Sequence, residues 1–288
     1  MTSHSAAEGW LVPQDWREYS AAEHAIWDQL FARQCEMLRD RAAPEVLEGM
    51  RVLQLGRRGI PDFNVLSEEL RARTGWQVKA VAGLVPEEVF FRHLAARTFV
   101  AGRFIRRADQ LDYLEEPDVF HDVFGHVPML THPVFADYMQ AYGEGGLRSV
   151  GFGSLDKLAR LYWYTVEFGL IATSAGLRIY GAGITSSFAE SRFALEDPSP
   201  HRLEFDLPRV LQTRYRIDDF QETYFVIDSF ESLLQQTLET DFAPLYRTLA
   251  TAPEYDPDTA LATDRVITRG TGDRARQRAS ALACTRKT

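Results

Sequence analysis

The sequence is poor in cysteine. Only Cys35 and Cys284 occur among its 288 residues, and they lie far apart in the chain. A disulfide-stapled scaffold needs several cysteine pairs, and a CxxC metal site needs closely spaced thiols. Both classes of protein are therefore excluded, and we expect the chain to work in a reducing compartment, the cytoplasm.

Long apolar runs are missing as well. No run reaches the roughly 18 residues from which a membrane-spanning helix is inferred. The first ten residues, MTSHSAAEGW, lack the basic start and the apolar stretch of a signal peptide. We therefore expect no membrane partner.

Basic charge is in deficit overall. Lysine and arginine total 32 against 41 acidic residues, a net charge of −9, which argues against a nucleic-acid partner for the whole molecule. From Arg269 to the end, six basic residues accompany one acid, Asp273. We predict that residues 261–288 form a disordered basic tail, with an arm for an acidic partner as the alternative.

The composition that is present is that of a globular domain. Hydrophobic residues make up 45% and aromatic residues 12%, enough for a large core. Helical spacing of apolar residues dominates, as after the capping box from Ser20 to Glu23 and over the long apolar pattern of 154–171, whereas strand-like segments such as 76–81 are short. We predict a mainly α fold with a few short strands, with an N-terminal arm over 1–18 and a single domain over 19–260.

Two histidines stand in the run PDVFHDVFGHVP at 117–128. His121 and His126 are five residues apart, which separates them by about 140° on a straight α-helix. Gly125, together with the residue before Pro128, predicts a break in the helix that would let both imidazoles reach one ion. Two partly buried core histidines are the alternative on spacing alone.

A carboxylate in the 154–171 pattern favours a metal. Glu167 would lie one helical turn from Trp163 and Ile171. Burying a carboxylate among such groups is costly unless it is paired, protonated or bound to a metal. Arg160 is the structural alternative, as an ion-pair partner.

Two imidazoles and one carboxylate form the facial triad of non-haem Fe(II) sites. A structural zinc site would usually take four protein ligands, and cysteine is scarce. A mononuclear zinc hydrolase remains the chemical alternative, although its usual HExxH motif is absent. A 2-oxoglutarate oxygenase would need more strands, and a metal-stabilised helical binding protein would bind iron without turnover.

Beyond this triad, the sequence resembles the pterin-dependent aromatic amino acid hydroxylases, most of all their short bacterial branch, the phenylalanine 4-hydroxylases. The similarity runs in family order from about Asp15 to Leu249. The matching stretches are VAGL at 81–84, QLDYLEEPD at 110–118, HDVFGHVP at 121–128, YWYTVEFGL at 162–170, IYGAGITSSFAES at 179–191 and RYRIDDFQETYFVIDSF at 214–230.

The resemblance implies that residues 19–260 form the single catalytic domain of an iron- and pterin-dependent monooxygenase. In such an enzyme His121, His126 and Glu167 bind Fe(II), and tetrahydrobiopterin or a related tetrahydropterin is the cosubstrate. L-phenylalanine and O2 would react through an Fe(IV)=O intermediate to give L-tyrosine, a step of phenylalanine catabolism and tyrosine biosynthesis. Tryptophan hydroxylation is the alternative within the family. The family's regulatory domain and oligomerisation helix have no counterpart in this sequence, so we expect a monomer.

The resemblance also assigns roles to other residues. It places the pterin against Phe90, Val81, Gly83, Leu84, Val85 and Glu116. It places the substrate against Arg106, which pairs with the carboxylate, and against Pro117, Trp163, Phe168, Gly183 and Ser187. Tyr162 and Ser186 fall beside the metal. The sequence departs from animal members at Leu114 and Asp122, where the short bacterial branch has the same residues.

Overall fold

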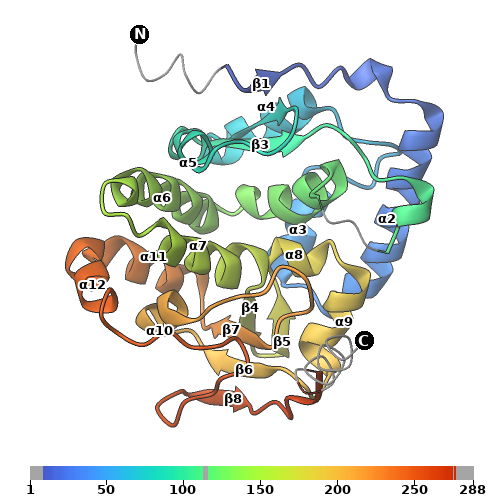
Figure 1. Ribbon diagram of the computed structural model, residues 1–288. Helices are drawn as coiled ribbons and strands as arrows, with labels where there is room; N and C mark the ends of the chain where they lie inside the picture. Colours follow the sequence, from blue (N-terminus) through green and yellow to red (C-terminus); the bar gives the residue numbers. More distant parts are fainter. Residues whose placement is uncertain (1–8, 113–115, 275, 277–288) are drawn as a thin grey trace, which may run out of the picture.

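Helices make up most of the molecule. The computed structural model describes residues 9–112, 116–274 and 276 (Figure 1). Its α-helices are α2 (Ala21–Leu38), α3 (Pro44–Val52), α4 (Phe63–Thr74), α5 (Glu87–Ala95), α6 (Pro133–Val150), α7 (Leu155–Tyr162), α8 (Ala182–Thr185), α9 (Phe188–Glu196), α10 (Leu207–Gln212), α11 (Phe230–Glu239) and α12 (Phe242–Leu249). Short 3-10 turns are η1 (Trp16–Glu18), η2 (Ala108–Gln110) and η4 (Val127–Thr131), and two segments are π-helical, η3 (Phe120–His126) and η5 (Trp163–Glu167).

Two small sheets flank the helices (Figure 1). The first has the order β1-β2-β3, with β1 (Leu11–Val12) antiparallel to β2 (Gln77–Val81) and β3 (Thr98–Gly102) parallel to it. Helix α5 makes the crossover between the two parallel strands, as such a connection requires. Part of the predicted N-terminal arm is therefore an edge strand of this sheet.

The second sheet has the order β5-β4-β7-β6-β8. Its strands are β4 (Leu170–Thr173), β5 (Gly176–Ile179), β6 (His201–Glu204), β7 (Thr223–Ile227) and β8 (Val266–Thr268). Helices α3, α6, α7 and α8 lie between the two sheets in Figure 1. The mainly α single domain predicted from the sequence is confirmed.

The segment predicted to be a disordered tail from residue 261 differs from that expectation. Strand β8 pairs antiparallel with β6, and Asp264 is bonded to the buried Arg209 at 2.9 Å. Arg274 forms an ion pair with Asp219. Residues 261–274 thus belong to the folded domain, while 275 and 277–288 lie outside the described residues.

Local signals at the helix ends are confirmed. The Ser20 hydroxyl accepts the Glu23 N–H, and the Glu23 carboxylate accepts the Ser20 N–H, which completes the capping box of α2.

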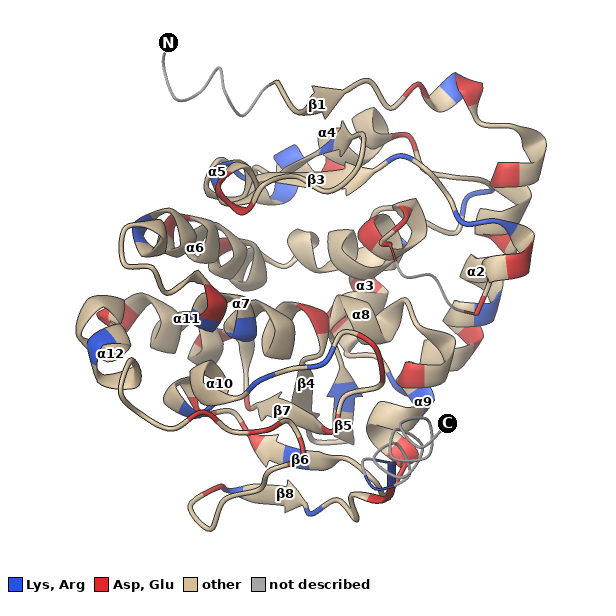
Figure 2. Cartoon of the chain, viewed as in Figure 1, with Lys and Arg blue, Asp and Glu red and all other residues tan. Residues whose placement is uncertain are grey.

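Opposite charges are interleaved along α2, α6 and α9 (Figure 2), and an ion pair between Arg41 and Glu196 joins the end of α2 to α9. No helix within the described ranges is both long enough and apolar enough to cross a membrane.

Candidate metal centre

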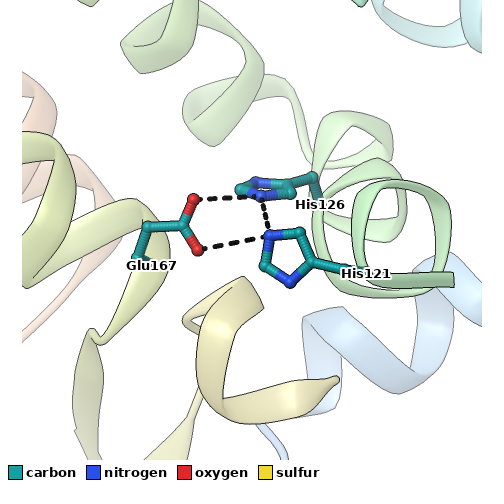
Figure 3. Close-up of side chains that lie close together, drawn as sticks. All are labelled: His121, His126 and Glu167. Atoms are coloured by element: carbon teal, nitrogen blue, oxygen red, sulfur yellow. Dashed lines mark hydrogen bonds and ion pairs between the residues drawn. The ribbon is translucent and has the colours of Figure 1, made fainter. Parts of the chain in front are cut away.

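Three polar side chains, those of His121, His126 and Glu167, point toward one another (Figure 3). The Nε2 atom of His126 lies 3.2 Å from one oxygen of Glu167, and the Nε2 atom of His121 lies 3.7 Å from the other. The two Nε2 atoms are 3.3 Å apart. One donor atom from each residue therefore falls within 4.8 Å of the others, close enough to share one ion.

The π-helical turn of η3 aligns the two histidines. In a π-helix the hydrogen bond joins residues five apart, so His126 lies above His121 on one side of the segment. The predicted break after Gly125 is wrong. The wider π-helical turn brings both imidazoles to one side while the helix continues to His126. Gly125 is needed for another reason: a Cβ there would lie 2.9 Å from the carbonyl oxygen of Ala182 in α8.

Glu167 also ends a π-helical segment. The Phe168 N–H donates to the Trp163 carbonyl at 2.8 Å, five residues back, so the helix predicted over 154–171 ends at Glu167. A Cβ on Gly181 would lie 2.4 Å from the Glu167 carbonyl oxygen, which shows how closely the next segment passes. Arg160 pairs with Glu254 at 2.8 Å, so the predicted alternative of an Arg160–Glu167 ion pair is wrong.

Ser186 fixes the orientation of His121. Its hydroxyl donates to the Ala182 carbonyl at 2.7 Å, and it therefore accepts from Nδ1–H of His121 at 2.9 Å. With the proton on Nδ1, the lone pair of Nε2 faces Glu167. Such a contact beside a ligand holds the imidazole in its metal-binding tautomer.

The charges suit a divalent cation. Burial lowers the pKa of His121 to about 4, so this imidazole is neutral at neutral pH. Burial alone would raise the pKa of Glu167, but the facing His126 and His121 bring it below its usual value. For His126 burial lowers the pKa, and the Glu167 carboxylate more than reverses that effect. His121 is thus ready to bind a metal, and His126 would release its proton to do so, as metal-binding imidazoles must. Two imidazole nitrogens and an ionised carboxylate, gathered at one point with positions left open, are the donor set of Fe(II).

A buried carboxylate joins this centre to Arg106. Asp118 is fully buried and accepts from Nε and Nη2 of Arg106, both at 2.8 Å, and from the backbone N–H of His121 at 3.0 Å. Burial favours the neutral acid, but the guanidinium outweighs burial and lowers the pKa of Asp118. Nη1 of Arg106 lies 3.5 Å from the Leu111 carbonyl, a weak bond that a better acceptor can replace.

The residues assigned to the pterin lie on one side of the centre. The Phe90 ring meets Tyr162 edge-on at 5.7 Å, and Tyr162 stacks near the His126 ring at 6.2 Å. The Glu116 carboxylate lies 3.8 Å from where a Cβ of Gly83 would be, so it faces the loop after β2. Val81, the last residue of β2, is buried, and in the loop that follows Val85 is half-buried and Leu84 is 76% exposed.

The residues assigned to the substrate ring lie on the other segments. The rings of Trp163 and Phe168 are 4.8 Å apart, and a Cβ on Gly183 would approach the Phe168 ring to 2.8 Å. Pro117 is half-buried directly before Asp118. The Ser187 hydroxyl caps α9 by accepting the Glu190 N–H at 3.3 Å, and its contact with substrate stays a prediction.

Sequence reasoning missed three residues near the site. It gave Asp118 no role, although the polar residue three positions before His121 was a usable capping signal. It also gave no role to Tyr215, whose ring stacks on Trp163 at 4.4 Å, or to Gln221, which accepts the Trp163 indole N–H at 2.8 Å.

Of the two positions that differ from animal members, Asp122 accepts the Gly102 N–H at 2.7 Å, and burial raises its pKa to about 7. Leu114 lies outside the described residues.

The fold and the triad define a class of protein that comparison identifies. Residues 8–263 match the family of biopterin-dependent aromatic amino acid hydroxylases, and the chain belongs to this family. Members of this class act on an aromatic amino acid with a pterin, and the resemblance stated from the sequence is confirmed.

Particular relatives are phenylalanine-4-hydroxylases. That of Caulobacter vibrioides is 59% identical over 92% of this chain and 90% of its own, and that of Ralstonia nicotianae is 58% identical over 90% of this chain and 83% of its own. The Chromobacterium violaceum phenylalanine hydroxylase with bound Fe(III) superposes with a TM-score of 0.87 at 51% identity, covering 93% of this chain and 100% of that one. Its iron- and phenylalanine-bound form has a TM-score of 0.85 at 49% identity, with the same coverage of both chains.

Proposed function

We propose that this chain is the catalyst for 4-hydroxylation of L-phenylalanine to L-tyrosine, with O2 and a tetrahydropterin as cosubstrates. The observation that carries the proposal is the convergence of His121, His126 and Glu167 in a member of this family. Its relatives at 53–59% identity are phenylalanine-4-hydroxylases, which favours phenylalanine over tryptophan as substrate. We further propose that the enzyme acts as a monomer in the cytoplasm.

His121, His126 and Glu167 would hold Fe(II). Iron and tetrahydropterin, when bound, supply O2 activation and two electrons, so that one oxygen atom enters the ring and the other leaves with the pterin. Ser186 keeps Nε2 of His121 free of a proton. The facing His126 and His121, with a smaller contribution from the Gly183 N–H, favour the ionised form of Glu167. The protein therefore presents a fixed anionic face with open positions beside it.

Arg106 binds the substrate carboxylate in this proposal. Asp118 holds the guanidinium through Nε and Nη2, which leaves Nη1 to point at an acceptor. The phenyl ring then enters the slot between Trp163, Phe168, Pro117 and Gly183. An apolar slot favours a phenyl ring and excludes water from the reacting carbon.

The pterin stacks on Phe90 in this proposal. The backbone from Val81 at the end of β2 to Val85, with Gly83 and the exposed Leu84, would form the adjoining wall. Glu116, which faces Gly83, would lie beside the pterin ring as an acidic group. Tyr162 packs between Phe90 and His126 and so sets the distance between the pterin side and the metal side of the site.

The test is aerobic incubation of purified enzyme with Fe(II), tetrahydropterin and L-phenylalanine, with tyrosine measured by chromatography. Omission of each component should abolish tyrosine, and tryptophan is run in parallel. Glu167→Gln, which keeps the shape and removes the charge, should lose activity and iron, whereas Glu196→Gln on the exposed face of α9 should keep both. Failure of the iron-loaded native enzyme to form tyrosine would overturn the proposal.

A further inference from the structure

A buried glutamine holds Trp163, one of the residues assigned to the substrate ring. Gln221 is 1% exposed and lies near the end of residues 213–222, which join α10 to β7. Its Oε1 accepts the indole N–H of Trp163 at 2.8 Å, and its Nε2 donates to the carbonyls of Arg216 at 3.0 Å and Asp219 at 3.4 Å. The Gln221 amide therefore bonds to two carbonyls of its own segment and also joins this segment to Trp163.

The same segment also covers the face of the indole. Tyr215 stacks on Trp163 with ring centroids 4.4 Å apart and an interplanar angle of 18°. The ring of Phe168, also assigned to the substrate, has its centroid 4.8 Å from that of the indole. Trp163 is therefore held by its face through Tyr215 and by its edge through Gln221, and its remaining freedom of rotation is small.

The segment is anchored independently of the substrate. The Gln221 backbone N–H donates to Glu190 in α9 at 3.1 Å. Next to it, the Phe220 ring packs on Phe193 at 4.9 Å, and the guanidinium of Arg274 lies 4.3 Å from the Phe220 ring centroid. These contacts from α9 and from the C-terminal segment make residues 214–221 a rigid support.

We propose that Gln221 is a positioning residue that fixes the Trp163 indole and so sets the shape of the slot for the aromatic ring. This inference rests on the proposed function, because it takes the slot to be the substrate site. An apolar residue in place of Gln221 leaves the indole N–H without its acceptor, and a half-buried donor in that state turns toward another partner. The slot then holds the ring less firmly, while the iron ligands stay in place.

The variant Gln221→Met keeps the length of the side chain and removes its polar atoms. A net hydrogen-bond contribution predicts a rise of about threefold to tenfold in KM for L-phenylalanine. Less tyrosine should form per tetrahydropterin oxidised, at unchanged iron affinity. Gln212→Met is the matched control, since Gln212 donates to the Pro253 carbonyl at 2.8 Å, away from the slot, and its KM should equal that of the native enzyme.

A readout without turnover uses the indole N–H resonance of Trp163 in the iron-free protein, assigned by its absence in Trp163→Phe. In Gln221→Met this resonance should shift, and its proton should exchange faster with D2O. Neither should change in Gln212→Met. An unchanged Trp163 resonance in folded Gln221→Met would overturn the inference.

The double variant separates positioning from a general structural effect. With Trp163→Phe the donor is gone, so adding Gln221→Met should raise KM much less than it does in the native background. Equal rises in both backgrounds would contradict the inference.

Should Gln221→Met not fold, Trp163→Phe alone must raise KM at unchanged iron affinity for the inference to stand. If the native enzyme forms no tyrosine, the proposed function has failed; if it does and the two methionine variants behave alike, only the inference has failed.

Discussion

Glu190 links the stability of the enzyme to pH. This carboxyl lies in α9, is 6% exposed, and accepts the Tyr224 hydroxyl at 2.8 Å and the Gln221 N–H at 3.1 Å. Burial raises its pKa from 4.5 to about 7. The folded state therefore binds a proton that the unfolded state has already released between these two pH values, and the enzyme loses stability as the pH rises through about 7.

The magnitude follows from the two pKa values. One pKa unit corresponds to about 1.4 kcal/mol, so a carboxyl raised from 4.5 to about 7 costs the folded state about 3 kcal/mol above pH 8 relative to below pH 4. Glu190→Gln keeps an oxygen for both donors and does not titrate. The unfolding free energy of the variant minus that of the native protein should therefore be about 3 kcal/mol larger at pH 8 than at pH 4.

Urea denaturation followed by circular dichroism at pH 4, 5, 6, 7 and 8, on iron-free protein, measures this difference. Glu196→Gln is the control on the same helix. The Arg41 hydrogen bond lowers the pKa of Glu196, so its contribution is lost as the pH falls, and the difference should run the other way. The reasoning is refuted if Glu190→Gln gains no stability over the native protein between pH 4 and pH 8.

Three further predictions follow from the metal centre. Ser186→Ala removes the partner of His121 and should weaken iron binding about tenfold to a hundredfold, measured by competition with a chelator. Gly181→Ala places a Cβ 2.4 Å from a backbone oxygen and should lower the free energy of unfolding by about 1–3 kcal/mol, measured by urea denaturation. Asp118→Asn breaks the buried pair with Arg106, should cost about 3–5 kcal/mol of stability, and should raise KM for phenylalanine. Because the pKa of Asp118 is lowered, its contribution is present at neutral pH and is lost as the pH falls through that pKa.

Gly181→Ala has a matched control, and the other two variants each have an outcome that would contradict the prediction. Gly145→Ala in α6 meets nothing closer than an Arg148 nitrogen at 3.8 Å and should not destabilise the protein. Iron affinity unchanged in Ser186→Ala would show that another group orients His121. A native-like KM in Asp118→Asn would show that Arg106 needs no fixed carboxylate to bind substrate.

Local signals in the sequence were enough to predict much of this molecule. The capping box at Ser20, the short strand at 77–81 and the helices around the site follow from spacing and end residues, which act within one or two turns. The buried Glu167 among aromatic neighbours pointed to a metal before any partner was known. These signals need no knowledge of distant contacts.

Contacts between distant segments could not be predicted in this way. Strand β8 pairs with β6, more than sixty residues earlier in the chain, so its short run of apolar residues was assigned to a tail. Gln221 meets Trp163 across 58 residues, and neither residue carries a local sign of the other. The π-helical turns of η3 and η5 were missed because an α-helical periodicity was applied to both segments.

Because η3 is a π-helical turn, the sequence spacing of its two ligands differs from the spacing expected on an α-helix. In an α-helix, ligands on one face are three or four residues apart, whereas here five residues return the chain to the same face. Removing one residue between His121 and His126 would bring the spacing to four, which an ordinary α-helix also places on one face. A search that fixes the spacing at one value would separate two such sites as unrelated, although a single deletion and one change of helical pitch interconvert them.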